Sequence, residues 1–276
     1  MTTEDFTESA VSDETQQSLV EQILESSPSR KHFLTGAAVA AAAGLIPGAS
    51  MAAGMTGMKG GHGHSHGMRR MAETPGSIFN IAATAEAAAV TALYNVHVAV
   101  GKGKLNVSGV AVPTDTLVSI VRAALREEQD HLSFLMGAGA KPLYTSFSFP
   151  GNIFTRATDT LTFFEAAETI FVAAYMAATR EFAFAGHNNL AQYTYQIGGV
   201  ECEHRTLMRA GLGQMPPNNK SFETNLYKKV SDAAAELGKL GIFKPGMSYP
   251  GAGAVDRILT TTVTKDVTAG VVQRKP

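Results

Sequence analysis

Two Glu-x-x-His pairs lie on the apolar faces of predicted helices, and they constrain the fold more than any other feature of the sequence. The first pair, Glu128 and His131, sits in LREEQDHLSFL, where apolar residues recur at the helical period. The second pair, Glu201 and His204, sits in VECEHRTLM with the same arrangement. Residues at i and i+3 lie on one face of a helix, about one turn apart. We therefore expect both carboxylate–imidazole pairs to point into a buried core.

Four long segments and a fifth, more polar one show the helical period after residue 75. They are Ser77–Val100, Pro113–Gly137, Ala157–Gly186, Asn188–Gly211 and the amphipathic run Ser221–Leu240. Gly186 is typical of a helix C-cap. The remaining stretch, 241–276, is predicted to be loop-like, with a short element at Val255–Val263 that the pattern does not type as helix or strand.

The connections between the long segments favour a four-helix bundle with one crossover. The third and fourth segments follow each other almost directly, whereas the second and third are joined through Gly139–Phe154. A connector of about eighteen residues at up to ~3.3 Å each can span the ~36 Å length of a helix of about 24 residues. The sequence therefore predicts two antiparallel hairpins joined by a long crossover. A simple up-down bundle is the alternative, because a long loop need not cross.

Every predicted bundle helix carries at least one acid on its apolar face. Glu86 is the only charged residue between Ser77 and Val100, and Glu165 and Glu168 share an apolar face in the third segment. A lone buried carboxylate costs several kcal/mol unless it is paired or neutralised. No lysine or arginine lies near the acids on these faces. Two divalent cations would supply the missing positive charge.

Carboxylates combined with imidazoles indicate two iron or two manganese ions. Cys202 is the only cysteine, so a thiolate zinc site or an iron–sulfur cluster is excluded. Taken singly, Glu86 would be a solvated helix residue and His131 a satisfied core histidine. One Glu-x-x-His motif is also expected by chance about half the time. The combination on four apolar helices is what indicates a site.

The pattern resembles the ferritin-like superfamily of carboxylate-bridged dimetal proteins. ALREEQDHLSFLMGAGAKPL, ETIFVAAY and VECEHRTL look like its bacterial, desiccation-related branch. The resemblance implies a ligand set with one Glu from each of two helices and Glu-x-x-His from the other two. In this sequence the matching residues are Glu86, Glu128, His131, Glu168, Glu201 and His204. Glu165 is an extra acid that the family pattern does not assign.

The N-terminal region resembles an export signal. Residues 1–28 are polar, and residues 29–53 begin SRKHFL, similar to the twin-arginine motif S/T-R-R-x-F-L with lysine for the second arginine. An apolar run of about fourteen residues follows, too short for a comfortable membrane span. This resemblance implies export as a folded protein to the periplasm or the medium. Cleavage is expected around 48–53, leaving no stable membrane span. An ordinary apolar helix is the alternative.

A Gly/Met/His-rich linker is expected at residues 54–75, before a bundle domain at 76–217 and a helix-and-tail region at 218–276. In this linker His62, His64 and His66 alternate with other residues and would bind metal weakly, or the segment is a plain spacer. The net charge is -1, without a block of like charges, which argues against nucleic acid as a partner.

Several functions fit these features. The leading one is a dimetal oxidoreductase or iron-handling protein acting with O₂ or peroxide in oxidative or desiccation stress. A dimanganese catalase uses a similar ligand set, and a non-catalytic stress protein, with metal stabilising the bundle or absent, is the third. Tyr94, Tyr175 or Tyr195 would carry electrons or serve only in packing. Helical packing also allows a homodimer.

Overall fold

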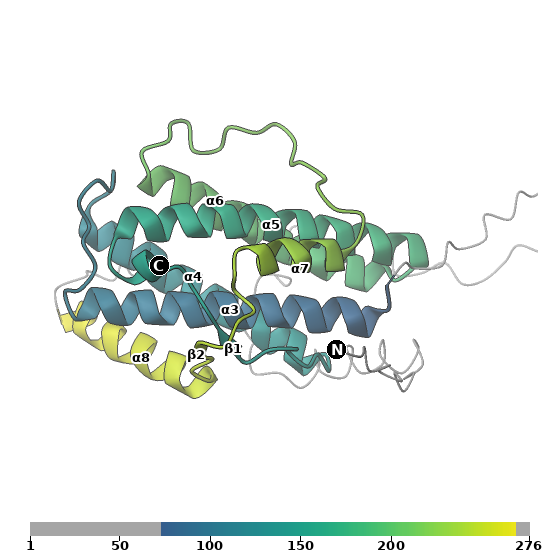
Figure 1. Ribbon diagram of the computed structural model, residues 1–276, viewed down its shortest axis with the longest axis horizontal. Helices are drawn as coiled ribbons and strands as arrows, with labels where there is room; N and C mark the ends of the chain where they lie inside the picture. Colours follow the sequence, from purple (N-terminus) through teal and green to yellow (C-terminus); the bar gives the residue numbers. More distant parts are fainter. Residues whose placement is uncertain (1–72, 269–276) are drawn as a thin grey trace, which may run out of the picture. The chain divides into compact units, whose positions relative to one another are not determined.

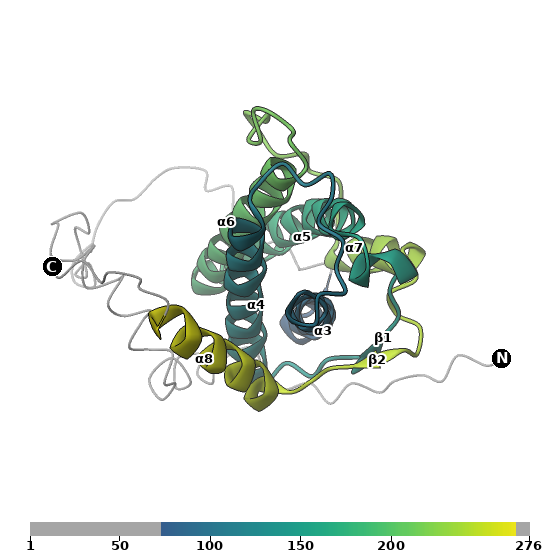
Figure 2. The same ribbon diagram turned by 90° about the vertical axis from the view of Figure 1, so that its left-hand side faces the viewer.

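The computed structural model describes residues 73–268, with side chains to residue 260. Four long helices form the body of this part of the chain (Figures 1 and 2). They are α3 (Pro75–Gly101), α4 (Thr114–Gly137), α5 (Ala157–Ala185) and α6 (Asn188–Gly211). The predicted all-α bundle is confirmed, and these bounds differ from the expected ones by two residues or fewer.

Local sequence explains where the helices begin and end. The Thr74 side chain accepts a hydrogen bond from the Ser77 N–H (3.1 Å), and Pro75 occupies the first helical position of α3. Both features favour a helix start, since proline has no N–H to leave unpaired there. Gly186 follows α5 with a φ of 82°, a left-handed conformation that favours glycine. The predicted C-cap is therefore present.

One end of the bundle brings together the end of α3, the starts of α4 and α5, and the end of α6. Asn106, just after α3, donates its N–H to the Thr155 carbonyl just before α5 (2.8 Å). Ala111, just before α4, donates to the carbonyl of Gly211 at the end of α6 (2.7 Å). The helices therefore run up, down, down and up, so α3 is antiparallel to α4 and α5 to α6.

The connection from α4 to α5 must consequently return along the whole bundle. It leaves at the far end, where the Lys141 N–H donates to Asn80 Oδ1 near the start of α3 (2.7 Å). On the way it forms β1 (Ser146–Phe147) and a short 3₁₀ turn (Gly151–Phe154). The predicted crossover is thus confirmed, and the up-down alternative is wrong.

The crossover is held by a short antiparallel sheet. Strand β1 pairs with β2 (Met247–Ser248), which follows α7 (Val230–Lys239) in the chain. A Cβ at Gly246 would lie 2.3 Å from the Phe147 carbonyl oxygen, so only glycine allows this approach. Phe147 is fully buried, and the sheet therefore anchors both the crossover and the C-terminal segment to the core.

The fifth helix is shorter than the predicted run Ser221–Leu240. Helix α7 spans Val230–Lys239, and residues 221–229 are not helical. The Glu73 carboxylate accepts hydrogen bonds from the Val230 N–H (2.7 Å) and the Ser231 N–H (3.1 Å), satisfying donors at the helix start. A periodic pattern does not show this boundary, because it is fixed by a residue distant in sequence.

The C-terminal region also differs from the loop-like tail expected. Residues 241–251 contain no helix, and β2 is their only regular element. They are followed by helix α8, which spans Ala252–Thr268. Val255 and Leu259, one turn apart, are buried, and α8 packs on α4. An ion pair from Arg126 to Asp256 (2.8 Å) links the two helices. The helix has too few apolar residues for its period to be recognised in the sequence.

Helices α3 and α5 are long and apolar enough, by length and composition, to cross a membrane. Within the described structure 72% of the most apolar window of α3 and 56% of that of α5 are buried. Their apolar character is therefore accounted for by the bundle core.

Close packing of α5 on α6 depends on Gly198, which gives a first prediction. A Cβ at Gly198 would lie 3.0 Å from Tyr175 Cβ, whereas a Cβ at Gly199 meets nothing within 4 Å. Alanine is the better helix former, so Gly199→Ala should raise the free energy of unfolding by about 0.5–1 kcal/mol. Gly198→Ala should instead lower it by about 1–3 kcal/mol through overpacking. Urea unfolding of both variants checks this, and equal stabilisation by both would contradict the packing argument.

Candidate metal centre

Six acidic and imidazole side chains from the four bundle helices meet in the core. They come from α3 (Glu86), α4 (Glu128, His131), α5 (Glu168) and α6 (Glu201, His204). The side chains of the four glutamates and of His204 are at most 1% exposed, and that of His131 is 12% exposed. All six residues expected from the sequence are thus brought to one place.

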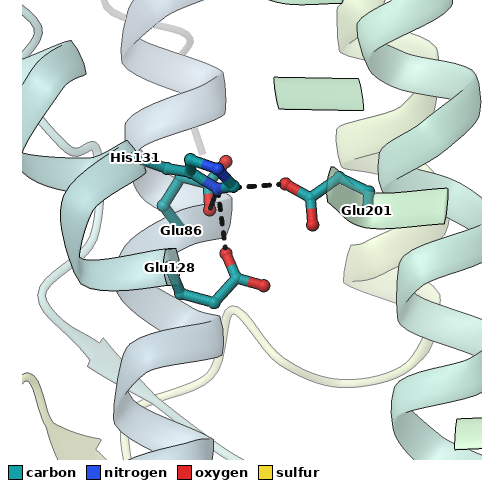
Figure 3. Close-up of side chains that lie close together, drawn as sticks. All are labelled: Glu86, Glu128, His131 and Glu201. Carbon is teal, nitrogen blue, oxygen red and sulfur yellow. Dashed lines mark ion pairs between the residues drawn. The ribbon is translucent and has the colours of Figure 1, made fainter. Parts of the chain in front are cut away.

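The first half of the cluster is centred on His131, as Figure 3 shows. Its Nδ1 lies 3.2 Å from Glu201 Oε1, 3.6 Å from Glu128 Oε2 and 3.7 Å from Glu86 Oε2. These four residues offer ligand atoms that all lie within 4.8 Å of one another. One cation could contact all of them.

The second half is centred on His204. Its Nδ1 lies 3.1 Å from Glu128 Oε1, 3.1 Å from Glu201 Oε2 and 3.8 Å from Glu168 Oε1. The ligand atoms of these four residues also lie within 4.8 Å of one another. Glu128 and Glu201 belong to both halves and offer a different oxygen to each. They could therefore contact both of two cations, while Glu86 and Glu168 each belong to one half and could contact one.

Unsatisfied polar atoms show that these residues fit a pair of metal ions. The buried atoms without a hydrogen-bond partner in the described part of the chain include Glu86 Oε2, both Glu128 oxygens, His131 Nδ1, Glu168 Oε2 and Glu201 Oε1. Such atoms are costly when left unpaired in a protein interior. Because they converge on two points, two divalent cations would satisfy them together, as oxygen and nitrogen donors do for iron or manganese.

The acids also interact strongly with one another. Burial and the Glu128 carboxylate raise the pKa of Glu86 well above its usual range. Burial and the charges of Glu128 and Glu201 do the same to the pKa of Glu168. Burial opposes ionisation of Glu128 too, but its interactions with Glu86 and the two histidines outweigh burial and hold the pKa of Glu128 below its usual range. Without metal, protons therefore carry the compensating positive charge, and cations would displace them.

Tyr175 contacts the cluster directly. Its hydroxyl donates a hydrogen bond to Glu86 Oε1, which leaves Oε2 facing His131. Burial and the Glu86 carboxylate raise the pKa of Tyr175 well above its usual range, so the hydroxyl keeps its proton. Tyr195 is 73% exposed. Of the three tyrosines considered from the sequence, only Tyr175 hydrogen-bonds a cluster residue in the described part of the chain.

Glu127 is the site residue that sequence reasoning missed. It falls beside the apolar face of α4, yet its Oε2 lies 2.8 Å from His204 Nε2. This contact fixes the ring so that Nδ1 points at the cluster, a common role of carboxylates behind metal-binding histidines. The corresponding position before the second Glu-x-x-His is Val200, so the two halves of the cluster differ. The sequence feature that could have indicated this role is the position of Glu127 directly before the first Glu-x-x-His motif.

The other acids and histidines considered from the sequence lie elsewhere. Glu165 binds Arg209 Nη1 (2.7 Å) and Gln214 Nε2 (2.9 Å) and belongs to neither half of the cluster. It ties α5 to the end of α6. His62, His64 and His66 lie outside the described residues.

Glu127 gives a second prediction. Glu127→Gln should weaken metal binding in one half of the cluster about 10–100-fold, because loss of a carboxylate behind a ligating histidine has this effect. Stepwise titration with Mn(II) against a competing chelator measures it. Glu203→Gln, which changes an exposed acid between Glu201 and His204, is the matched control and should bind as the wild type does. Equal affinities for Glu127→Gln and the control would show that the contact does not support the site.

Comparison with known proteins agrees with this architecture. No curated protein and no solved structure matches the chain significantly. The model of the ferritin-like domain matches residues 75–214, a range that includes the four bundle helices and all six cluster residues. The chain therefore belongs to the ferritin-like domain family.

Proposed function

We propose that this protein binds two iron or two manganese ions in the bundle core and uses them in redox chemistry with O₂ or peroxide. The observation that supports the proposal is the pair of overlapping ligand groups that share Glu128 and Glu201. The six cluster residues would hold the ions, which as Fe(II) would supply two electrons to one oxidant molecule: with two protons, O₂ would give hydrogen peroxide, or hydrogen peroxide would give two water molecules.

The residues around the cluster have defined parts in this proposal. Glu86 and Glu168 would each bind one ion, and Glu128 and Glu201 would bridge the two. Tyr175 holds a proton at its hydroxyl and fixes Glu86 Oε1. Glu127 is 47% exposed and touches His204 Nε2, so it connects the buried imidazole with solvent. The apolar core excludes water from the remaining space and keeps the charged atoms facing one another.

Iron and manganese are distinguished by elemental analysis of the protein recovered from its own host. About two atoms per chain are expected, following the two ligand groups. Peroxide-driven release of O₂ by the native-metal protein would favour catalase-like activity. Oxidation of added Fe(II) with O₂ or peroxide would favour a ferroxidase. Two bound metals without either activity would favour a structural role in stress protection.

The bridging residue Glu128 gives the third prediction. Glu128→Ala should abolish binding of both metals, because this carboxylate contributes to both ligand groups. Glu86→Ala should remove one metal position only. Metal content per chain after dialysis measures the effect. Glu165→Gln, which changes an acid outside the cluster, should retain two metals. Two metals bound by Glu128→Ala would contradict the proposal.

Metal removal gives the fourth prediction. A ligand that binds only the folded state stabilises it, by about 2.7 kcal/mol when its free concentration is 100-fold above Kd. Chelation should therefore lower the free energy of unfolding of the loaded protein by about this amount per bound ion. Urea unfolding with and without chelator measures it. The chelator should have no effect on Glu128→Ala, and a loss of the same size there would indicate an effect unrelated to the cluster.

We also propose that the protein is exported and acts in oxidative or desiccation stress, as the desiccation-related branch would imply. The support is the SRKHFL segment followed by an apolar run. Cell fractionation tests the location. Replacing Arg30 and Lys31 by glutamine should retain the protein in the cytoplasm if this segment is the export signal. Unchanged export would contradict this assignment without affecting the metal site.

A further inference from the structure

Two small cavities lie beneath α7, in the groove between α3 and α5. The first, of about 30 Å³, is lined by residues that include Ile81, Ala234 and Tyr175. The second, of about 10 Å³, is lined by residues that include Ala89 and Glu168. The first has room for about one or two molecules of the size of water, and the second is at the lower limit for one. Helix α7 lines the first with Val230, Ala233, Ala234 and Leu237, and the second with Leu237 alone.

The two cavities follow one another toward the metal centre. Both cavities have half-buried lining residues, Ile81 and Ala234 at the first and Phe149 and Phe163 at the second, so both lie close to solvent. Phe171 and Leu237 line both cavities and form the partition between them. The second cavity ends at Glu168, which belongs to the cluster. Two separate cavities thus lie in a row beneath α7, and the second reaches a proposed metal ligand.

The mostly apolar lining of the cavities determines which small molecules they can bind. Apart from the polar groups of Tyr175, Thr194 and Glu168, all lining side chains are apolar. The Tyr175 hydroxyl is engaged by Glu86, and the Thr194 hydroxyl bonds Leu190 within its own helix. A buried water needs two to four polar partners, so apolar cavities of this kind remain dry and accept small apolar molecules. O₂ is small and apolar, as this lining requires, whereas hydrogen peroxide is polar and would lose its hydrogen bonds there.

Polar molecules have a different approach to the cluster. Helices α4 and α6 form the opposite side of the bundle from α3 and α5 (Figure 2). On that side Glu127 is 47% exposed and directly contacts His204. His131, also on α4, has a side chain that is 12% exposed. Metal ions and peroxide would therefore reach the cluster more easily from the α4–α6 side.

We propose that the first cavity beneath α7 binds O₂, and that O₂ passes from it by the second cavity to the metal centre from the α3–α5 side. This inference rests on the proposed redox function and adds to it the oxidant and its route. Leu237 and Phe171 control passage between the cavities, and Ala234 borders the entrance.

Xenon binding tests the cavities in the metal-free protein, independently of any redox activity. Xenon is apolar and slightly larger than O₂, and its binding is followed by NMR shifts of methyl groups on titration with the gas. The wild type is expected to show saturable shifts at Leu237 and its neighbours. Ala234→Leu should reduce xenon affinity at the first cavity, and Leu237→Ala should raise it by joining the two. Ala235→Leu, on the exposed face of the same helix, should bind xenon as the wild type does. Absence of saturable shifts in the wild type would overturn the proposal.

Oxidation rates test delivery. Protein loaded with two Fe(II) per chain is mixed with dissolved O₂ or with hydrogen peroxide, and absorbance of the ferric product is followed. Ala234→Leu should slow oxidation by O₂ about tenfold while changing the rate with peroxide less than about twofold. Ala235→Leu should change neither rate. Equal slowing with both oxidants, or no slowing with either, would overturn the assigned route.

These outcomes are distinct from failure of the proposed function. If the wild-type protein binds no Fe(II), or is oxidised by neither oxidant, the redox function is wrong and O₂ delivery with it. Saturable xenon binding would then show only a cavity. If the wild type is oxidised by both oxidants and the rates of Ala234→Leu match those of Ala235→Leu, the redox function stands and the route beneath α7 is wrong.

Discussion

The burial of four carboxylates at the centre of an apolar bundle is the constraint on which the rest of the structure depends. Glu86, Glu128, Glu168 and Glu201 come from four different helices, and each is at most 1% exposed. Their mutual repulsion and desolvation would separate the helices if nothing opposed them. Two imidazoles supply part of the opposing charge. Two divalent cations would supply the remainder and connect all four helices at one point.

Helix packing around this point is uneven, and small residues explain why. Gly198 allows α6 to approach Tyr175 on α5 closely, which places the Tyr175 hydroxyl against Glu86 on α3. The groove between α3 and α5 needs a separate cover, and the buried face of α7 provides it. Glu73 fixes the start of α7 through two backbone N–H groups. The support of the cluster therefore extends well beyond its six residues.

The sequence predicted the features that depend on local periodicity. Helical bounds, the C-cap at Gly186 and the inward orientation of both Glu-x-x-His pairs follow from residues within a few turns. What it missed depends on distant partners. The start of α7 is set by Glu73. Helix α8 is held against α4 mainly by Val255 and Leu259. Glu127 on α4 contacts His204 on α6. Glu165 shares the apolar face of Glu168, yet Arg209 and Gln214 on another segment bind it.

The two sides of the bundle differ in polarity because the helices contribute different residues to them. Alanines of α3 and α5 lie beside α7, and their short side chains leave small cavities with a largely apolar lining. On the α4–α6 side, Glu127 extends from solvent to a buried imidazole. The proposed redox centre would benefit from this separation, since a single open channel would hydrate the carboxylates and weaken their binding of metal. The polar route on the α4–α6 side can then remain narrow, because O₂ would reach the cluster from the α3–α5 side.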